Sequence, residues 1–373
     1  MNTFGSYFRT TTWGESHGSA IGTVIDGCPP GIDIKREDIQ DELSRRRPGQ
    51  TVFTSQRNEE DRVDILSGVF NGKTTGTPIS LIIYNKDIRS SDYEKLKNIP
   101  RPGQADFTYL KKHGIRDYRG SGRASGRETA SRVAAGAIAK KILFKEGIVT
   151  VGFSAKIGEV GIRNGSLITD YNISREEALK LRELIYKSPV RCPEIETSHK
   201  MEKTIQNISK EEDSLGGIIE ILSYGVPPGL GSPVFDKLDA LIAHAVMSVG
   251  AVKGVEIGEG FEIASKKGST ANDVFEFKNG IVKPKTNRAG GILGGISTGM
   301  PIVVKAAVKP TPSIQKTQQT VDFNGKPVSL SVEGRHDPCI VVRMVPVLEN
   351  MLNLVLVDML LLQKALKGGE KNE

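Results

Sequence analysis

Arg119-Gly-Ser-Gly-Arg-Ala-Ser-Gly-Arg-Glu-Thr-Ala-Ser-Arg132 is a basic, glycine-rich run that leads directly into an alanine-rich segment, Val133 to Phe144. The composition of that segment predicts a helix. Ser125 and Glu128 have the spacing of a capping box, in which the serine hydroxyl binds the backbone N–H of the third helical residue. The sequence therefore predicts that loop and helix meet near Ser125.

A junction of this kind favours an anionic ligand. Unpaired backbone N–H groups and the positive end of the helix dipole attract negative charge, and glycines allow a close approach to the backbone. Four arginines add fixed cations suited to phosphate or carboxylate: Arg119, Arg123, Arg127 and Arg132. The run predicts an anion-binding loop, and the alternative is a solvated basic turn that only begins a helix.

The composition is that of a folded globular protein. The chain has 373 residues, of which 38% are hydrophobic and 25% charged, so it can bury the core of one large domain or two medium ones. Its net charge of +7 indicates anionic partners, which include nucleic acids, membrane surfaces and small metabolites. Single arginines beside glycine and proline, with only 6% aromatic residues, favour a small anion over nucleic acid.

Cysteine usage and hydropathy indicate a cytoplasmic protein without a membrane partner. Cys28, Cys192 and Cys339 lie far apart and form no C-x-x-C motif, so neither a disulfide framework nor a metal site is predicted. The first 18 residues lack the apolar core of a signal peptide. The most apolar segment, Met344 to Leu362, is interrupted by polar residues and predicts a buried helix.

Apolar periodicity predicts both strands and helices along the chain. Strands are expected at residues 4–12, 21–25, 63–70, 79–84, 150–160 and 217–223, with 63–70 and 79–84 as an antiparallel hairpin. Helices are expected at residues 35–44, 174–187, 196–210 and 235–249, the second and third of them peripheral. His244 in the last helix is interpreted as a core residue. The segment Asn85 to Tyr118 is expected to be a long loop, and residues 364–373 a charged, disordered tail.

Two segments repeat a short pattern. Thr75-Gly-Thr-Pro-Ile-Ser80 and Ser297-Thr-Gly-Met-Pro-Ile-Val303 both follow a glycine turn and lead into a β-branched run. Because the similarity is short, it leaves an internal duplication open without establishing it.

Six motifs in sequence order indicate a family. They are Gly14-Glu-Ser-His-Gly18, Arg45-Arg-Arg-Pro-Gly49, Gly122-Arg-Ala-Ser-Gly-Arg-Glu-Thr-Ala130, Arg132-Val-Ala-Ala-Gly136, Ala289-Gly-Gly-Ile-Leu-Gly-Gly-Ile-Ser297 and Gly334-Arg-His-Asp-Pro-Cys339. Through them the chain resembles the chorismate synthase family from about Phe4 to Leu362. The resemblance implies one catalytic domain over residues 1–363, an α+β fold with helices packed between antiparallel β-sheets, and a homotetramer.

The resemblance also implies a reaction. The family converts 5-enolpyruvylshikimate 3-phosphate to chorismate and phosphate by a 1,4-anti elimination, the last common step of the shikimate pathway to aromatic amino acids. It requires reduced FMN although no net oxidation occurs, and NADPH or a separate flavin reductase could supply the reducing equivalents. A substrate with one phosphate and two carboxylates agrees with the scattered arginines of this chain.

Site residues follow from the same resemblance. His17 matches the histidine that protonates reduced flavin, and Ser16 belongs to the same site. Asp337 matches the carboxylate that handles the flavin N5 proton, with capping of the last helix as the alternative. The implied substrate-binding residues are Arg46, Arg101, Gln104, Arg127 and Arg335. The implied FMN-contacting residues are Arg123, Ala124, Ser125, Gly250, Ala251, Gly294, Lys309, Pro310, Thr311, Pro312, Ser313 and Arg335, of which Ser125 is also assigned to the catalytic group.

The chain departs from the family pattern at several of these positions. Gln104 stands where the family usually has histidine and cannot deliver a proton, so His113 is a candidate to compensate. Val52 replaces a residue that is often basic, which leaves NADPH binding open. Three further substitutions are expected to alter FMN contacts more than the chemistry: Ala124, Gly250 and Pro312.

Overall fold

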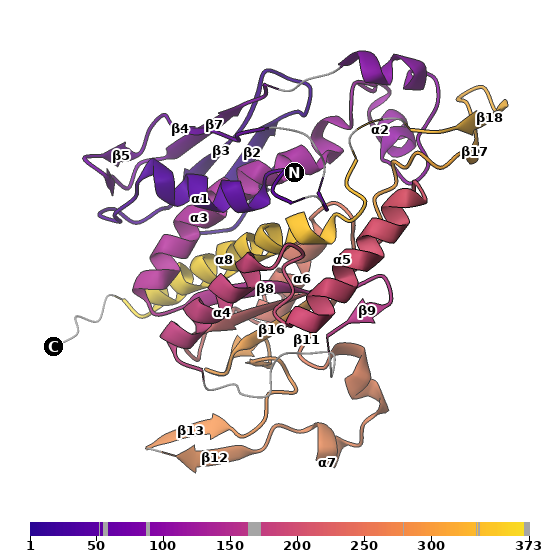
Figure 1. Cartoon of the computed structure of the whole chain (residues 1–373). Helices are drawn as coiled ribbons and strands as arrows, with labels where there is room; N and C mark the ends of the chain where they lie inside the picture. Colours follow the sequence, from indigo (N-terminus) through magenta and orange to yellow (C-terminus); the bar gives the residue numbers. More distant parts are fainter. Residues whose placement is uncertain are drawn as a thin grey trace.

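Two antiparallel sheets enclose a layer of helices (Figure 1). The computed structural model describes residues 1–51, 53–54, 59–86, 90–162, 173–278, 280–332, 334 and 336–368. The first five-stranded sheet has the order β1 (Thr3–Phe4), β2 (Arg9–Gly14), β3 (Ala20–Asp26), β7 (Ile79–Tyr84), β4 (Val63–Ile65). The second has the order β11 (Val252–Ile257), β16 (Ile302–Val308), β10 (Gly217–Tyr224), β8 (Val149–Ile157), β9 (Val160–Gly161). The predicted α+β class is confirmed.

The helices of the central layer are α1 (Arg36–Arg46), α3 (Thr129–Lys145), α6 (Leu238–Met247) and α8 (Val341–Leu366). Three of the four are mostly apolar, whereas α1 is mostly charged and buries Ile39 and Leu43. α8 is long and apolar enough to cross a membrane, but 89% of its most apolar window is buried inside the protein. It packs against α3, α6 and strands of the second sheet, so the predicted core helix is confirmed.

The two halves of the chain repeat one order of elements. The first half runs β2, β3, α1, β4, β7, α3, and the second runs β8, β10, α6, β11, β16, α8. Corresponding strands occupy corresponding places, because β7 pairs with β3 and β4 as β16 pairs with β10 and β11. This repeated topology supports the internal duplication.

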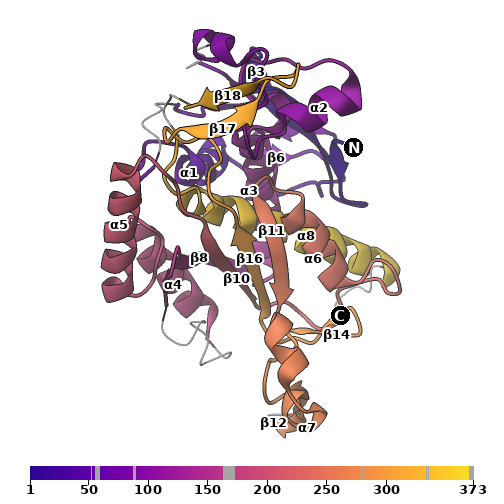
Figure 2. The same ribbon diagram turned by 90° about the vertical axis from the view of Figure 1, so that its right-hand side faces the viewer.

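Smaller elements extend from both ends of this body (Figure 2). β12 (Phe275–Lys278) and β13 (Ile281–Pro284) form a hairpin that projects beyond the second sheet together with α7 (Gly268–Ala271) and the 3-10 helix η5 (Gly260–Ser265). The hairpin of β17 (Gln318–Val321) and β18 (Pro327–Leu330) lies at the opposite end beside α2 (Asp106–His113). The remaining short pairs are β5 (Val69–Phe70) with β6 (Lys73–Thr74) and β14 (Ile292–Leu293) with β15 (Ile296–Ser297).

The start of α3 differs from the prediction. Two 3-10 turns, η2 (Gly122–Ala124) and η3 (Gly126–Glu128), precede the helix, which begins at Thr129. Ser125 Oγ accepts a hydrogen bond from the backbone N–H of Arg127 at 3.2 Å, and the Glu128 carboxylate pairs with Arg132 Nε at 2.9 Å. Ser125 is an N-cap as predicted, although of η3 and not of α3. The reciprocal bond of the capping box does not form, because Arg132 engages the Glu128 carboxylate that would have turned back toward Ser125.

Three other expectations require correction. The segment after β7 is not a continuous loop, because it contains η1 (Ser90–Leu96) and α2. His244 is not a core residue, because it is exposed at the C-terminal end of α6 and packs edge-on against Phe4. The tail expected at residues 364–373 begins as helix, because α8 extends to Leu366 and Lys364 Nζ contacts Glu146 at 2.5 Å. Residues 369–373 lie outside the described part of the chain.

The predicted helices of the middle region are confirmed as α4 (Arg175–Lys187) and α5 (Ile195–Lys210), but α4 is not merely peripheral. Its Arg182 is buried and bonds Glu42 of α1 and Glu349 of α8, each at 3.0 Å. Lys140 of α3 reaches the same Glu42 at 2.7 Å. Burial raises the pKa of Glu42, but Arg182 and Lys140 outweigh it and lower that pKa to about 2. One charged network thus joins four helices.

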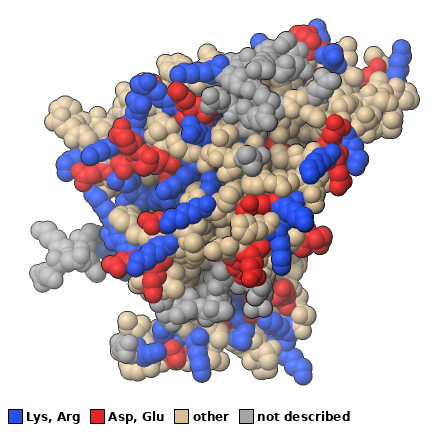
Figure 3. Space-filling view, in the orientation of Figure 1, with Lys and Arg blue, Asp and Glu red and all other residues tan. Residues whose placement is uncertain are grey.

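Charge on the surface is mixed. On the face shown in Figure 3, the described lysines and arginines lie among aspartates and glutamates. A face with interspersed charges lacks the single-sign field that steers long polyanions.

Candidate active site

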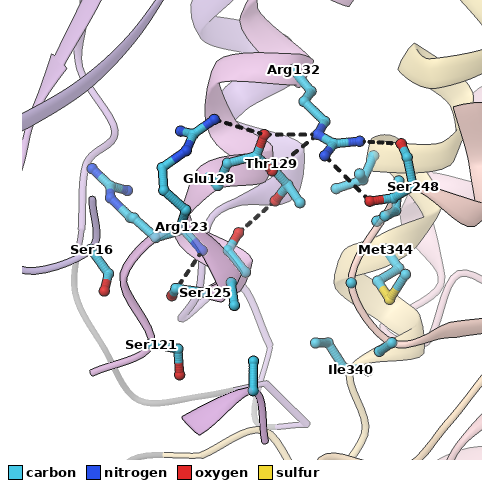
Figure 4. Close-up of a pocket in the computed structure, with 18 of the residues that line it drawn as sticks. Ser16, Ser121, Arg123, Ser125, Glu128, Thr129, Arg132, Ser248, Ile340 and Met344 are labelled. Atoms are coloured by element: carbon cyan, nitrogen blue, oxygen red, sulfur yellow. Dashed lines mark hydrogen bonds and ion pairs between the residues drawn. The ribbon is translucent and has the colours of Figure 1, made fainter. Parts of the chain in front are cut away.

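A cavity of about 910 Å³ lies at one end of the helical layer (Figure 4). The C-terminal ends of α1 and α6 and the N-terminal ends of α3 and α8 meet there. Loops before β3, after α2 and after β16 complete the wall. The positive dipole ends of α3 and α8 are offset by the negative ends of α1 and α6, so it is the arginines of the wall that favour an anionic ligand.

Most of the predicted site residues meet at this cavity although they are far apart in the sequence. Those that line it are Ser16, His17, Arg46, Arg101, Gln104, Arg123, Ala124, Ser125, Arg127, Gly250, Ala251, Lys309, Thr311, Pro312, Ser313 and Asp337. Pro310 belongs to the same loop as Lys309 but does not line the cavity, and Gly294 lies in the β14–β15 turn away from it. The predictions for Arg335 and Val52 fall outside the described residues.

The loop between β2 and β3 places His17 and Ser16 in the wall. The His17 ring stands edge-on to Tyr93, with centroids 5.1 Å apart and an interplanar angle of 86°. Gly120 has φ +73°, and a Cβ there would lie 2.6 Å from His17 Cδ2 and 3.0 Å from Ser16 Oγ. Only glycine fits at that position. Ser16 Oγ is buried and has no hydrogen-bond partner among the described residues, so it can bind a ligand.

Arg46 is held rigidly at the C-terminal end of α1. It is 3% exposed, and its donors reach Thr129 Oγ1 at 3.1 Å, Asp61 Oδ2 at 3.1 Å and the carbonyl oxygen of Gly126. Burial, reinforced by repulsion from Arg343, lowers the pKa of Arg46 to about 10. The group remains protonated at neutral pH, but its donors are already engaged by the protein.

One guanidinium nitrogen of Arg127 has no protein partner among the described residues. The Nε of Arg127 donates to Asn85 Oδ1 at 2.8 Å, and its Nη1 bonds Asp61 and lies 2.5 Å from Glu59 Oε2. Its Nη2 is buried and has no partner in the described part of the structure, and Arg127 lines the cavity. An unpaired buried donor is costly, so this atom is suited to an incoming anion.

Asp61 was not singled out from the sequence, yet it bridges two of the predicted arginines. Its side chain is 0% exposed and contacts both Arg46 and Arg127. Although burial raises its pKa, these two arginines hold the pKa of Asp61 below its usual range. Its backbone has φ +48°, an uncommon conformation for a residue with a side chain.

Arg101 and Gln104 organise the loop opposite His17. Arg101 forms a two-point ion pair with Asp106, at 2.8 and 2.9 Å, and donates to the carbonyl oxygen of Gly120 at 2.8 Å. Gln104 Nε2 donates to Ser313 Oγ at 3.0 Å. His113 is exposed on α2 and does not line the cavity, so the structure does not place it where it could replace an imidazole at position 104.

Asp337 is held by an arginine that the sequence reading missed. Arg343 Nη1 donates to Asp337 Oδ2 at 2.6 Å, and its Nε donates to the carbonyl oxygen of Arg46 at 3.3 Å. Asp337 does not cap α8, whose N-cap is Ile340 without a side-chain hydrogen bond. A charged residue in the first turn of an otherwise apolar helix was the available signal for Arg343. His336 also lines the cavity and was not assigned.

The basic loop is therefore not a solvated turn. Arg123 donates to the carbonyl oxygen of Gly14 at 3.1 Å and to Thr12 Oγ1 at 2.6 Å. Arg132 forms an ion pair with Glu128, and its Nη1 donates to Ser248 Oγ at 2.6 Å (Figure 4). Arg119 differs from these, because it is exposed and pairs with Asp117 at 2.7 Å. Most of the loop's cations are thus built into the cavity wall.

Comparisons with known proteins agree with this arrangement. The family model "Chorismate synthase" matches residues 8–361. The chain is 53% identical over 358 residues to chorismate synthase of Methanococcoides burtonii, covering 96% of this chain and 95% of that protein. It is also 53% identical over 366 residues to chorismate synthase of Pelagibacter ubique, covering 98% and 99%. A crystal structure of chorismate synthase superposes with a TM-score of 0.76 at 35% identity, covering 96% of this chain and 93% of that one. The chain belongs to the chorismate synthase family of lyases.

Proposed function

We propose that this protein converts 5-enolpyruvylshikimate 3-phosphate to chorismate and phosphate by a 1,4-anti elimination with reduced FMN bound in the cavity. The observation that carries the proposal is the arginine-lined cavity itself, built from the family's motifs and lined by Arg127, whose Nη2 is unpaired among the described residues. A substrate with three anionic groups matches a wall that presents several guanidinium groups.

The residues present fit a flavin. Several buried polar atoms of the cavity wall have no hydrogen-bond partner among the described residues, including Ser16 Oγ, Arg127 Nη2 and Thr311 Oγ1. A volume of about 910 Å³ is near the upper end of the range for ligand sites, which leaves room for a flavin and a small substrate together. Residues 123–125, 250–251 and 309–313 would hold the flavin. When bound, reduced flavin would donate an electron to the substrate as phosphate leaves and would receive it back as the ring hydrogen is removed, so that no net oxidation occurs.

The protein's own groups supply binding and proton transfer. Arg127 and Arg343 would bind the anionic groups of the substrate, with Arg46 fixed behind them. His17 lines the cavity and is assigned as the acid. Asp337, oriented by the ion pair with Arg343, is assigned as the base. Asp337, Arg46 and Arg127 are buried, which limits their contact with water.

An anaerobic assay tests the reaction. The purified protein is mixed with reduced FMN and 5-enolpyruvylshikimate 3-phosphate, and chorismate and phosphate are measured together. We expect equal amounts of both products, and none when the flavin is kept oxidised. Absence of chorismate with reduced FMN would refute the proposal.

Several finer points belong to the same proposal. We expect a cytoplasmic homotetramer, which light scattering after size-exclusion chromatography tests. Whether NADPH or a separate reductase reduces the flavin is decided by an aerobic assay with NADPH and no added reductase. We expect no nucleic-acid partner, because basic and acidic residues are interspersed on the face in Figure 3. Salt-sensitive binding to DNA or RNA at low ionic strength would contradict that expectation.

A further inference from the structure

We propose that Asn85 is a positioning residue that couples the anion-binding Arg127 to the loop that carries Ser16 and His17. Its effect on catalysis rests on the function proposed above, whereas its effect on the loop does not. Nothing in the sequence motifs pointed to Asn85, which follows β7 directly and lies 42 residues before Arg127.

The Asn85 side chain uses both of its polar atoms. Its Nδ2 donates to the carbonyl oxygen of Glu15 at 2.9 Å and to that of Gly18 at 2.8 Å. Its Oδ1 accepts a hydrogen bond from Arg127 Nε at 2.8 Å. Two carbonyl acceptors on one side and a guanidinium donor on the other leave only one orientation for the amide.

The two carbonyl groups are the ends of one tight turn. The backbone N–H of Gly18 donates to the carbonyl oxygen of Glu15 at 3.2 Å, so Ser16 and His17 occupy the centre of the turn. By binding both ends, Asn85 fixes the turn as a unit. The turn then presents Ser16 Oγ and the His17 ring to the cavity.

Asn85 is itself fixed by the first sheet. Its backbone N–H donates to the carbonyl oxygen of Ser19 at 3.0 Å, which continues the antiparallel pairing of β3 with β7 beyond the partners Ala20 and Tyr84. A side chain that begins from a paired strand end loses little entropy when it forms further bonds. The sheet is therefore the rigid reference for the turn.

Arg127 is the other end of the coupling. Asp61 and Glu59 bind its Nη1, while its Nη2 has no partner in the described structure. A guanidinium is planar, so an anion that binds Nη2 and rotates the group must also move Nε against Asn85. Binding of the substrate at Arg127 is thus linked mechanically to the position of His17.

Three variants separate the two sides of this coupling. Asn85→Asp keeps an acceptor for Arg127 but has no N–H to offer Glu15 and Gly18, so we expect kcat to fall more than KM rises. Asn85→Ala removes all three bonds, and we expect kcat/KM to fall about ten- to hundredfold. Tyr84→Ala is the matched control, because Tyr84 is exposed at the end of the same strand and does not line the cavity.

A spectroscopic measurement distinguishes this proposal from the proposed function. The His17 ring protons, assigned by comparison with His17→Ala, are followed by NMR without flavin or substrate. Because the ring of Tyr93 stands edge-on to His17, loosening the turn changes their chemical shifts. We expect a change in Asn85→Ala and none in Tyr84→Ala, whether or not the wild-type protein forms chorismate.

The outcomes decide the matter. Two results would overturn the proposal. The first is that the His17 chemical shifts are unchanged in a folded Asn85→Ala protein. The second is that Asn85→Asp lowers kcat by the same factor in the His17→Ala protein as in the wild type. If Asn85→Ala does not fold, Asn85→Ser, which is too short to span the three partners, provides the same test. Inactive wild-type protein with altered His17 shifts in the variant would refute the proposed function alone.

Discussion

Replacement of Gly120 by alanine should displace the His17 ring while leaving the fold intact. Gly120 has φ +73°, and an added Cβ would lie 2.6 Å from His17 Cδ2, 2.8 Å from His17 Nε2 and 3.0 Å from Ser16 Oγ. Ordinary carbon contacts are about 3.5 to 4.0 Å. The ring must therefore move by up to about 1 Å, because the backbone of Gly120 is anchored by Arg101.

Two terms contribute to the effect. Forcing alanine into the left-handed region costs about 1 to 2 kcal/mol in the free energy of unfolding. Displacing a catalytic group by about 1 Å can lower the rate about a hundredfold. The first term affects stability only, so the second is isolated by a control with the same backbone cost.

Gly72→Ala provides that control. Gly72 also has φ +73°, but a Cβ there has no atom within 4 Å. Both variants should lose similar stability in urea titrations, whereas only Gly120→Ala should lose chorismate synthesis in the anaerobic assay. FMN binding, followed by fluorescence, shows whether the cavity remains formed.

The reasoning fails if Gly120→Ala retains wild-type kcat while it is destabilised as much as Gly72→Ala. It also fails if Gly72→Ala loses as much activity as Gly120→Ala. Either result would mean that the close approach of Gly120 does not determine where His17 lies.

Three further substitutions test other parts of the structure. His17→Ala should lower kcat about a hundredfold or more and leave FMN affinity nearly unchanged, as measured by turnover and flavin titration. Arg127→Ala should raise the substrate KM about ten- to hundredfold and lower stability, because Asp61 loses a buried partner, whereas the exposed Arg119→Ala should do neither. Glu42→Gln should make the free energy of unfolding depend less on pH under acidic conditions. The pKa of Glu42 is lowered to about 2, so its ionised form stabilises the fold above its usual pKa near 4.5, and that stabilisation is lost as the pH falls toward 2.

Each of these has a result that contradicts it. Equal turnover of His17→Ala and wild type would exclude the proton role. An unchanged KM in Arg127→Ala would place that side chain outside the substrate site. For Glu42→Gln, urea midpoints that fall with acid as steeply as in the wild type would show that the charged helix network does not set acid stability.

The spacing of residues in the sequence predicted some elements correctly and others not. Two serine–glutamate pairs with the spacing of a capping box show why. Ser174 and Glu177 form the reciprocal bonds of a capping box at the start of α4. Ser125 and Glu128 have the same spacing, but Glu128 is buried beside Arg132 and Thr12 and never turns back. The sequence shows the spacing in both cases. Only the folded chain shows which partners compete for the carboxylate.

The same limit applies to the site. Motifs identified Ser16, His17 and Arg127, because their residue types and neighbours are distinctive. Asp61 and Asn85 were not identified, because their importance comes from contacts with Arg127 across 66 and 42 residues. Those contacts arise from the pairing of β7 with β3 and from the turn of the chain after α1. No local pattern encodes them.

The position of α8 in the chain has a consequence for biosynthesis. α8 follows every other described element, yet it packs against α3 and the second sheet at the centre of the molecule. While the ribosome still holds residues 341–366, the face of α3 that α8 covers has no permanent partner. The nascent chain must therefore wait for its last helix before the core closes, and until then it presents a surface that chaperones and proteases recognise.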